Sequence, residues 1–440
     1  MESAKLTSRE FKSPVLLTLS LLLAGIPVAI HQFKVPPIMI EVANSVGLTD
    51  DKAPLLMSAF MLACFALSLP AGLLVEKAKV KHAIALAACF SAVGSAVGSY
   101  AGSAPTLLFS RGLEGAGFVL MCIAIPVAVS TYINPKDLGL VMGICSVWIS
   151  LGSILAYNTV PLLGNSYSWG GIWKIYAVLT VAGIALFWVL FGSDPAGGSA
   201  KRVESAGRDP ANGSAKLMEA VPGSASVKPL EVTPGAATKI SATGEPAAKP
   251  SLAAAFGNRN LILPSIGFMA FNINMIAMFT FFPVSVTAAG LMTIEKASFI
   301  ASLPMILSLG SLPLFGKLAD RVGHKSLYML TLLGGGVGVG LMFVKSVPVI
   351  LAGAVLLGLV GSATPGLIFS SIGKLIPSQD LVAQSNGIVI LFQNAGLFIS
   401  TALFGVLVTA LGGNYTIAGL LLIPMTLFAV GLVSRAQYNE

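Results

Sequence analysis

Long apolar runs recur along the whole chain, and they constrain its fold more than any other feature. A helix of about 20 apolar residues crosses a hydrocarbon core of roughly 30 Å while satisfying its own backbone hydrogen bonds. Transmembrane strands would instead alternate apolar and polar residues over about ten positions. The pattern therefore predicts an all-α membrane protein with twelve transmembrane helices. The first begins at Pro14, and the others are expected at 54–75, 82–101, 105–131, 138–163, 170–192, 260–286, 297–317, 325–344, 348–374, 382–411 and 415–434.

The low content of charged residues places these helices in a membrane and not in a soluble core. Hydrophobic residues make up 55% of the chain and charged residues 10%, whereas soluble domains carry about 25% charged residues. The formal net charge of +8 would fit a nucleic-acid partner if the bases clustered on a soluble domain. They are instead spread over the loops between apolar runs, so no nucleic-acid partner is predicted.

The sequence contains no motif for nucleotide, metal or cofactor chemistry. Neither G-x-x-x-x-G-K-[ST] nor H-E-x-x-H occurs, and the three histidines are scattered. The glycine-rich run 334–340 lies inside an apolar stretch without a preceding strand, so it predicts close helix packing. Four cysteines inside apolar runs are expected to be packed thiols: Cys64, Cys89, Cys122 and Cys145. We therefore expect no metal, no cofactor and no enzymatic activity, and a transporter of this kind would use a gradient.

A stretch of different composition, residues 193–255, separates two groups of six apolar runs. Gly, Ala, Ser, Pro and Thr dominate it, and such a sequence buries too little apolar area to offset its ordering entropy. We expect two bundles, 1–192 and 256–440, joined by a disordered cytoplasmic linker. A regulatory segment is the alternative interpretation of this linker. Lys and Arg are concentrated in the loops on the same side as both termini, so the positive-inside rule predicts cytoplasmic termini.

Two copies of one basic turn lie between apolar runs, one in each predicted bundle. The second copy, at 316–325, reads G-K-L-A-D-R-V-G-H-K, and the first, at 72–81, reads G-L-L-V-E-K-A-K-V-K. The second copy resembles the loop signature of the major facilitator superfamily of transporters. This resemblance implies two pseudo-symmetric six-helix bundles, transport by alternating access, a monomer, and a gating role for the two motifs. The motif residues are Gly72, Glu76, Lys77, Gly316, Asp320, Arg321, Gly323 and Lys325.

The first copy of the motif departs from the signature. Glu76 replaces the usual Asp, Lys77 replaces the Arg, and Lys79 replaces the second Gly. We therefore expect the first loop to pack differently from the second.

Ionisable residues inside the apolar runs are the best candidates for a transport site, because each is costly at the bilayer centre unless it is paired or hydrated. His31 and Lys34 lie three residues apart in the first run and therefore on one helical face. Arg111 and Glu114 have the same spacing in the fourth run, within a sequence that resembles the family's fourth-helix signature with Glu114 in place of Gln. Other interpretations remain open: Arg111 and Glu114 as a structural pair, Lys34 reaching the outer interface, and His31 as a packing residue.

The second bundle offers uncharged polar groups opposite these residues. Asn272 and Asn274 occupy the run that is the repeat partner of the first, Gln393 and Asn394 occupy the eleventh run, and Asn158 lies in the fifth. We expect these amides to bind substrate in a cavity that is cationic on the side of the first bundle. Hydrogen bonding between helices is the alternative explanation for most of them.

Within the runs three basic residues face one acid, so we expect at least one cation to lack a protein partner. An anionic substrate would then supply the missing negative charge. In this hypothesis His31, Lys34 and Arg111 bind a small organic or inorganic anion, such as a monocarboxylate, and His31 or Glu114 carries the coupled proton. The sequence H-Q-F-K-V-P-P at 31–37 resembles cyanate, nitrite and small-carboxylate permeases of the superfamily. We expect a symporter of the cytoplasmic (inner) membrane whose partners are the substrate, protons and the lipid bilayer.

The alternative function is proton-driven efflux of drugs or other apolar or cationic compounds. The family's antiporter signature, G-x8-G-x3-G-P, is kept at Gly143 and Gly152, but Ala156 and Tyr157 replace its Gly-Pro pair. The first run also lacks the acidic residue that many such exporters carry, with His31 near the corresponding depth. These departures favour anion transport over efflux.

Overall fold

Helices are the regular secondary structure in the part of the chain that can be described. The computed structural model describes residues 14–133, 137–191, 256–376 and 382–438, and within these ranges the regular elements are α-helices and 3-10 turns, without a strand. The all-α prediction is therefore confirmed. The predicted linker, 193–255, lies outside the described residues.

The N-terminal half contains eight α-helices and two 3-10 turns in its described residues. They are α1 (Pro14–Phe33), η1 (Pro36–Ile38), α2 (Met39–Ser45), η2 (Asp50–Lys52), α3 (Leu55–Lys77), α4 (Val80–Ser99), α5 (Ala104–Tyr132), α6 (Leu138–Ser146), α7 (Trp148–Gly164) and α8 (Trp169–Phe191). The described residues of the C-terminal half contain α11 (Arg259–Ala288), α12 (Ile294–Val322), α13 (His324–Met342), α14 (Val347–Leu359), η3 (Gly361–Ala363), α15 (Thr364–Leu375), α16 (Val382–Ala410), α17 (Tyr415–Leu420) and α18 (Leu422–Val433).

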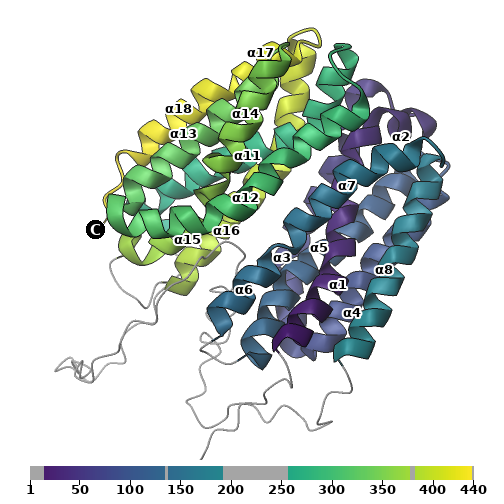
Figure 1. The fold of residues 1–440 in the computed structure, drawn as a ribbon, viewed down its shortest axis with the longest axis horizontal. Helices are drawn as coiled ribbons and strands as arrows, with labels where there is room; N and C mark the ends of the chain where they lie inside the picture. Colours follow the sequence, from purple (N-terminus) through teal and green to yellow (C-terminus); the bar gives the residue numbers. More distant parts are fainter. Residues whose placement is uncertain (1–13, 134–136, 192–255, 377–381, 439–440) are drawn as a thin grey trace, which may run out of the picture.

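These helices form twelve membrane-spanning segments in two bundles of six. Among the described residues, 11 helical segments are long and apolar enough to cross a membrane. The remaining predicted span, 297–317, corresponds to α12, a helix of 29 residues. Three spans consist of two successive helices, namely α6 with α7, α14 with α15, and α17 with α18. Figure 1 shows the two bundles side by side, with α1 to α8 in one and α11 to α18 in the other.

Prolines determine where the first helix ends. α1 stops at Phe33, and Pro36 and Pro37 begin the turn η1 directly afterwards. Proline has no N–H group, so neither Pro36 nor Pro37 can continue the hydrogen bonds of the helix. Carbonyl groups in the last turn of α1 are therefore available to other donors.

Small residues allow the helices to approach closely. A side chain at Gly94 of α4 would meet the backbone nitrogen and Cγ of Glu114 in α5, both at 2.9 Å. In the second half a side chain at Gly338 would meet the carbonyl of Gly353 at 2.9 Å. The prediction that the glycine-rich run serves helix packing is confirmed by this contact between α13 and α14.

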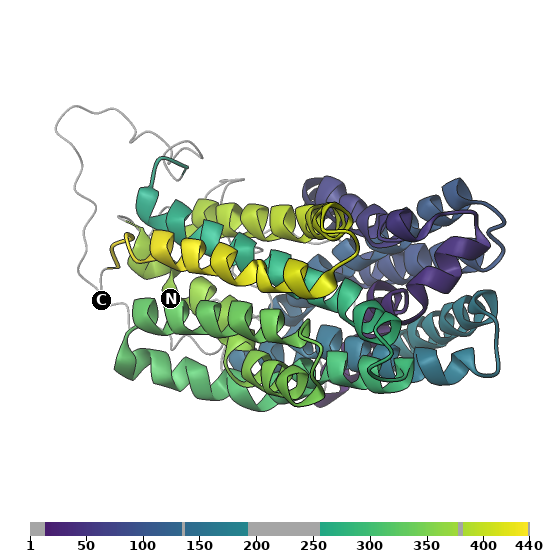
Figure 2. The ribbon, with the colours of Figure 1, turned by 90° about the horizontal axis from the view of Figure 1, so that it is seen from above.

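The two halves are joined near one end of the bundle, the end opposite to the start of α1 and the end of α18 (Figures 1 and 2). The Tyr157 hydroxyl of α7 donates to the backbone carbonyl of Phe279 in α11 at 2.5 Å. The Ser58 hydroxyl of α3 lies 2.6 Å from that of Thr401 in α16. We call this end of the molecule the joined end, and the opposite end the terminus end.

Proline also explains the contact to Phe279. Pro283 lies four residues after Phe279 within α11, and it has no N–H for the Phe279 carbonyl. The Tyr157 hydroxyl supplies that missing donor from the other half. The ring of Phe33 at the end of α1 packs against both partners, with centroid distances of 6.1 Å to Tyr157 and 5.2 Å to Phe279.

Candidate functional site

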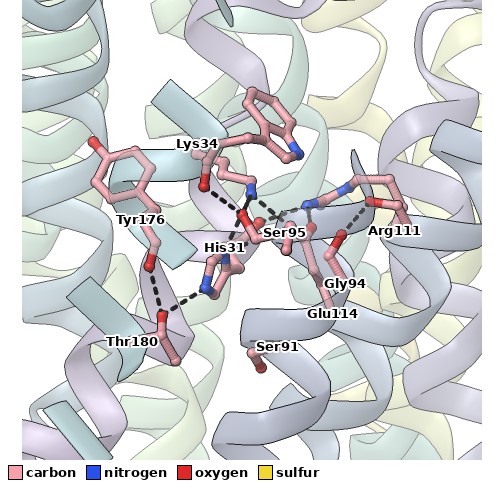
Figure 3. Close-up of polar contacts among 12 residues, drawn as sticks. His31, Lys34, Ser91, Gly94, Ser95, Arg111, Glu114, Tyr176 and Thr180 are labelled. Carbon is pink, nitrogen blue, oxygen red and sulfur yellow. Dashed lines mark hydrogen bonds and ion pairs between the residues drawn. The ribbon is translucent and has the colours of Figure 1, made fainter. Parts of the chain in front are cut away.

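The ionisable residues predicted inside the first bundle form one buried cluster. His31 in the last turn of α1 and Lys34 directly after it meet Arg111 and Glu114 from α5 (Figure 3). All four side chains have 0% exposure. Each pair is brought to one helical face by its spacing of three residues. The close approach of α4 at Gly94 leaves room for Glu114 beside it.

The Lys34 ammonium has three acceptors, which is all that it can donate to. They are Glu114 Oε1 at 2.6 Å, Ser95 Oγ at 2.8 Å and His31 Nδ1 at 3.1 Å. The ring of Trp173 in α8 lies 4.1 Å from Nζ and adds a cation–π contact. Lys34 is thus surrounded by protein, so the alternative in which it reaches the outer interface does not hold in this structure.

His31 is held in one tautomer by its neighbours. The Thr180 hydroxyl of α8 donates to the backbone carbonyl of Tyr176 at 2.8 Å, so its oxygen accepts from His31 Nε2, also at 2.8 Å. His31 Nδ1 then carries no proton and accepts from Lys34. A neutral imidazole with the proton on Nε2 therefore fits the series of hydrogen bonds from Lys34 through His31 and Thr180 to the Tyr176 carbonyl (Figure 3).

Arg111 spans from the carboxylate to two backbone carbonyls. Its Nη1 donates to Glu114 Oε2 and to the His31 carbonyl, the latter at 2.7 Å, and its Nε donates to the Leu56 carbonyl at 3.1 Å. The His31 carbonyl is one of the groups that the end of α1 leaves available. The ring of Phe60 lies 4.7 Å from the guanidinium carbon.

Both cations therefore share a single carboxylate, Glu114. The sequence led to the expectation that one cation would have no protein partner, and that expectation is wrong: Lys34 and Arg111 both contact Glu114. The excess lies in charge and not in contacts, since two cations and one carboxylate leave the cluster with a net positive charge when His31 is neutral. A buried excess of this kind is costly, because the desolvation of each ion must be offset locally.

The other predicted substrate residues do not join this cluster. The Asn272 amide donates to the Phe268 carbonyl of its own helix at 2.7 Å, and the Asn274 amide donates to Thr426 Oγ1 in α18 at 2.8 Å. These contacts fit the alternative of hydrogen bonding within and between helices. The remaining two residues in that half, Gln393 and Asn394, lie half-buried in α16.

Asn158 connects the two halves. Its amide in α7 donates to Ser302 Oγ in α12 at 3.1 Å and to the Ile154 carbonyl of its own helix at 2.7 Å. It lies one residue after Tyr157, which also makes a contact between α7 and the C-terminal half. In this conformation Asn158 therefore belongs to the joined end and not to the cationic cluster.

Several residues that touch the cluster were not predicted, among them Ser95, Thr180 and Trp173. Ser95 of α4 accepts from Lys34 and donates to the Trp173 carbonyl at 2.9 Å, Thr180 orients His31, and the Trp173 ring covers Lys34. Single hydroxyl residues within apolar helices give no sequence signal that separates this role from ordinary packing.

The second basic motif builds a turn between helices. Gly323 ends α12 with φ of +94°, a conformation that residues with a Cβ rarely adopt. Lys325 donates to the carbonyls of Ser434 and Ala436 at 2.8 and 2.7 Å, next to the end of α18, where a cation is favourable. Arg321 is exposed, and Gly72 in the first motif has open space around it. The side chains of Glu76, Lys77 and Asp320, and the surroundings of Gly316, lie outside those that the structure describes.

Comparison with known proteins identifies the family to which this architecture belongs. The family model of the Major Facilitator Superfamily matches residues 17–294 and 268–437. No curated protein matches the sequence. Among solved structures, a point-mutant form of the nucleoside transporter NupG superposes with a TM-score of 0.72 at 14% identity, over 95% of this chain and 99% of that chain. At this level of identity the match shows the shared fold.

Proposed function

Since this chain belongs to the major facilitator superfamily, we propose that it is a secondary transporter that moves a small organic or inorganic anion across the cytoplasmic membrane by alternating access. The observation that carries this proposal is the sharing of Glu114 by Lys34 and Arg111 inside one bundle. Two buried cations and one carboxylate leave a positive charge that a monocarboxylate or a similar anion would neutralise.

The chemistry of the two cations suits an anion of small size. Arg111 presents a planar fork that binds carboxylates in a bidentate manner, whereas Lys34 acts as a point charge. The aromatic rings of Phe60 and Trp173 cover these cations and limit the room beside them. The resemblance of residues 31–37 to small-anion permeases supports the same substrate class.

Glu114 offers a route for proton coupling. It is the common partner of both cations, so a proton on its carboxylate would release donors from Lys34 and Arg111 for an incoming anion. Binding of the proton and of the anion would then favour each other, and their joint movement cancels the cost of carrying charge against the membrane potential. His31 is the second candidate for this proton, since its Nδ1 lies 3.5 Å from Glu114 Oε1.

The orientation in the membrane follows from the distribution of basic loops. The positive-inside rule would place the terminus end, where α1 begins and α18 ends, in the cytoplasm. The joined end would then face outward, and this conformation would be closed to the outside. In the outward-open conformation we expect Asp320 to approach the start of α6 near Leu138, where the helix dipole favours a carboxylate. Asp320→Asn should then alter transport kinetics, and unchanged kinetics would argue against this gating role.

Uptake into proteoliposomes tests the substrate class. The panel contains acetate, nitrite and cyanate as anions, uridine because the matched structure is of a nucleoside transporter, and a lipophilic cation for the exporter alternative. We expect saturable anion uptake with acidification of the vesicle interior. Lys34→Gln and Arg111→Gln should each abolish it, and Arg111→Lys should not restore it fully, because lysine lacks the planar fork.

A matched control is available in the same bundle. Lys174 of α8 is exposed and contacts the ring of Tyr100 at 4.2 Å, so Lys174→Gln removes a cation without touching the cluster. It should leave uptake unchanged. Saturable transport of the lipophilic cation, or wild-type anion uptake by Lys34→Gln, would favour the exporter. Anion uptake without internal acidification would refute proton symport while leaving the substrate class standing.

A further inference from the structure

We propose that the anion attaches to the Nη2 edge of the Arg111 guanidinium, and that the thioether of Met57 holds this position while no anion is bound. This inference rests on the proposed function and names the atoms at which its substrate binds. Met57 lies in the first turn of α3, with 0% exposure, and is outside the set of residues that the sequence suggested.

The argument begins with a count of donors. All three Lys34 donors have oxygen or nitrogen acceptors within 3.1 Å. In Arg111, Nε and both hydrogens of Nη1 are also directed at oxygen acceptors. Nη2 is different: among the residues that the structure describes, its hydrogen-bond partner is the sulfur of Met57 at 4.0 Å.

A thioether is a poor partner for a guanidinium. Methionine sulfur is a weak acceptor, whereas an oxygen of an anion would form a charge-assisted bond of about 2.7–2.9 Å with the same N–H. Nη2 carries two hydrogens, so one donor pair faces only this weak acceptor. The excess positive charge of the cluster is therefore least compensated at the Nη2 edge.

The Met57 side chain can change its conformation to make room for an anion. Its side chain is unbranched and has three rotatable bonds, so it can repack where a branched residue could not. Its place in α3 also ties the site to the other half, since the neighbouring Ser58 binds Thr401 of α16. An anion that displaces Met57 would act on the first turn of α3, the segment that makes this contact.

Two substitutions at Met57 separate this site from its alternatives. Met57→Gln places an amide oxygen at a similar reach, which would satisfy Nη2 internally and compete with the anion. Met57→Leu keeps the apolar volume and removes the sulfur, leaving Nη2 without any acceptor. For acetate uptake into proteoliposomes we expect KM to rise about tenfold or more in Met57→Gln and to fall in Met57→Leu, with a smaller change in kcat in each.

The outcomes distinguish this inference from the proposed function. If the wild type takes up none of the anions, the proposed function fails and this site fails with it. If the wild type takes up acetate and KM is unchanged in both variants, only the Met57 site is refuted. Should Met57→Gln not fold, Met57→Leu decides alone: a KM equal to or above that of the wild type overturns the proposal. Acetate-dependent protection against thermal unfolding provides a binding readout, and it should weaken in Met57→Gln in parallel with KM.

Discussion

Neutralising Glu114 should destabilise the protein more than neutralising an exposed acid. In the wild type, Lys34 and Arg111 share this carboxylate with all three side chains at 0% exposure. Glu114→Gln keeps the size of the side chain and leaves two buried cations without an acid. Removing one partner of a buried ion pair costs about 3–5 kcal/mol, because the remaining charge is buried without compensation. We expect a loss of stability in this range.

A second substitution makes the charge argument testable. The double variant Lys34→Met, Glu114→Gln leaves Arg111 as the remaining cation of the cluster, which restores its wild-type charge. It should regain about 1–3 kcal/mol relative to Glu114→Gln, a typical coupling energy for residues in one network. Asp51→Asn, an exposed acid in the turn η2, is the control and should change stability by less than about 0.5 kcal/mol.

Unfolding in mixed micelles, followed by tryptophan fluorescence, measures these differences for all four proteins under the same conditions. The reasoning fails if Glu114→Gln is as stable as Asp51→Asn. It also fails if the double variant is less stable than Glu114→Gln, because the loss would then come from packing and not from charge.

Three further outcomes are expected. Gly94→Ala should destabilise the N-terminal half by about 1–3 kcal/mol, because the added methyl group would meet Glu114. The control Gly112→Ala, whose methyl group would have no neighbour within 4 Å, should be neutral or stabilising, and equal melting temperatures of the two variants would contradict this. Tyr157→Phe removes one hydrogen bond between the halves, which contributes about 0.5–1.5 kcal/mol. It should increase the labelling of cysteines introduced at the joined end, and unchanged labelling would show that this bond does not hold that end closed. Deletion of residues 200–245 should leave membrane insertion and uptake intact, and loss of either at equal expression would assign the segment a structural or regulatory role.

The fold could be predicted from the sequence because membrane insertion imposes a length on every helix. Each apolar run must satisfy its own backbone hydrogen bonds, so its length directly marks a span. The breaks within spans were harder to place. The break between α6 and α7 lies at Val147 and that between α17 and α18 at Leu421, and neither residue is a proline or glycine that would mark it.

The charged centre of the candidate site was also predictable, whereas its hydroxyl partners were not. A charged residue inside an apolar run is costly, so Lys34 and Arg111 stand out in the sequence. Serine gives no such signal, because its hydroxyl can bond to the backbone of its own helix. Ser91 and Ser95 lie one turn apart in α4: Ser91 donates to the Ala87 carbonyl of its own helix, while Ser95 binds Lys34 and the carbonyl of Trp173. Only the position of the neighbouring helices separates the two roles.

The sequence also does not determine what the amides of the second half bind. An asparagine in a helix can donate to the carbonyl four residues earlier, as Asn272 does, or to a neighbouring helix, as Asn274 does. Both choices give the amide N–H group an acceptor within the protein. Sequence alone shows that a polar group must find a partner, but not whether that partner is the protein.

The distribution of contacts suits a transporter that alternates between two conformations. The ion pairs of the cluster lie within one half, one inside α5 and one between α5 and the residue after α1, so they need not break when the halves move. The contacts described at the joined end are neutral: hydroxyl groups, an amide and aromatic rings. Each neutral hydrogen bond contributes about 0.5–1.5 kcal/mol, whereas separating a buried ion pair would cost about 3–5 kcal/mol. Keeping the charges inside one bundle and placing weak contacts between the bundles therefore allows the joined end to open at a cost that binding of a substrate can offset.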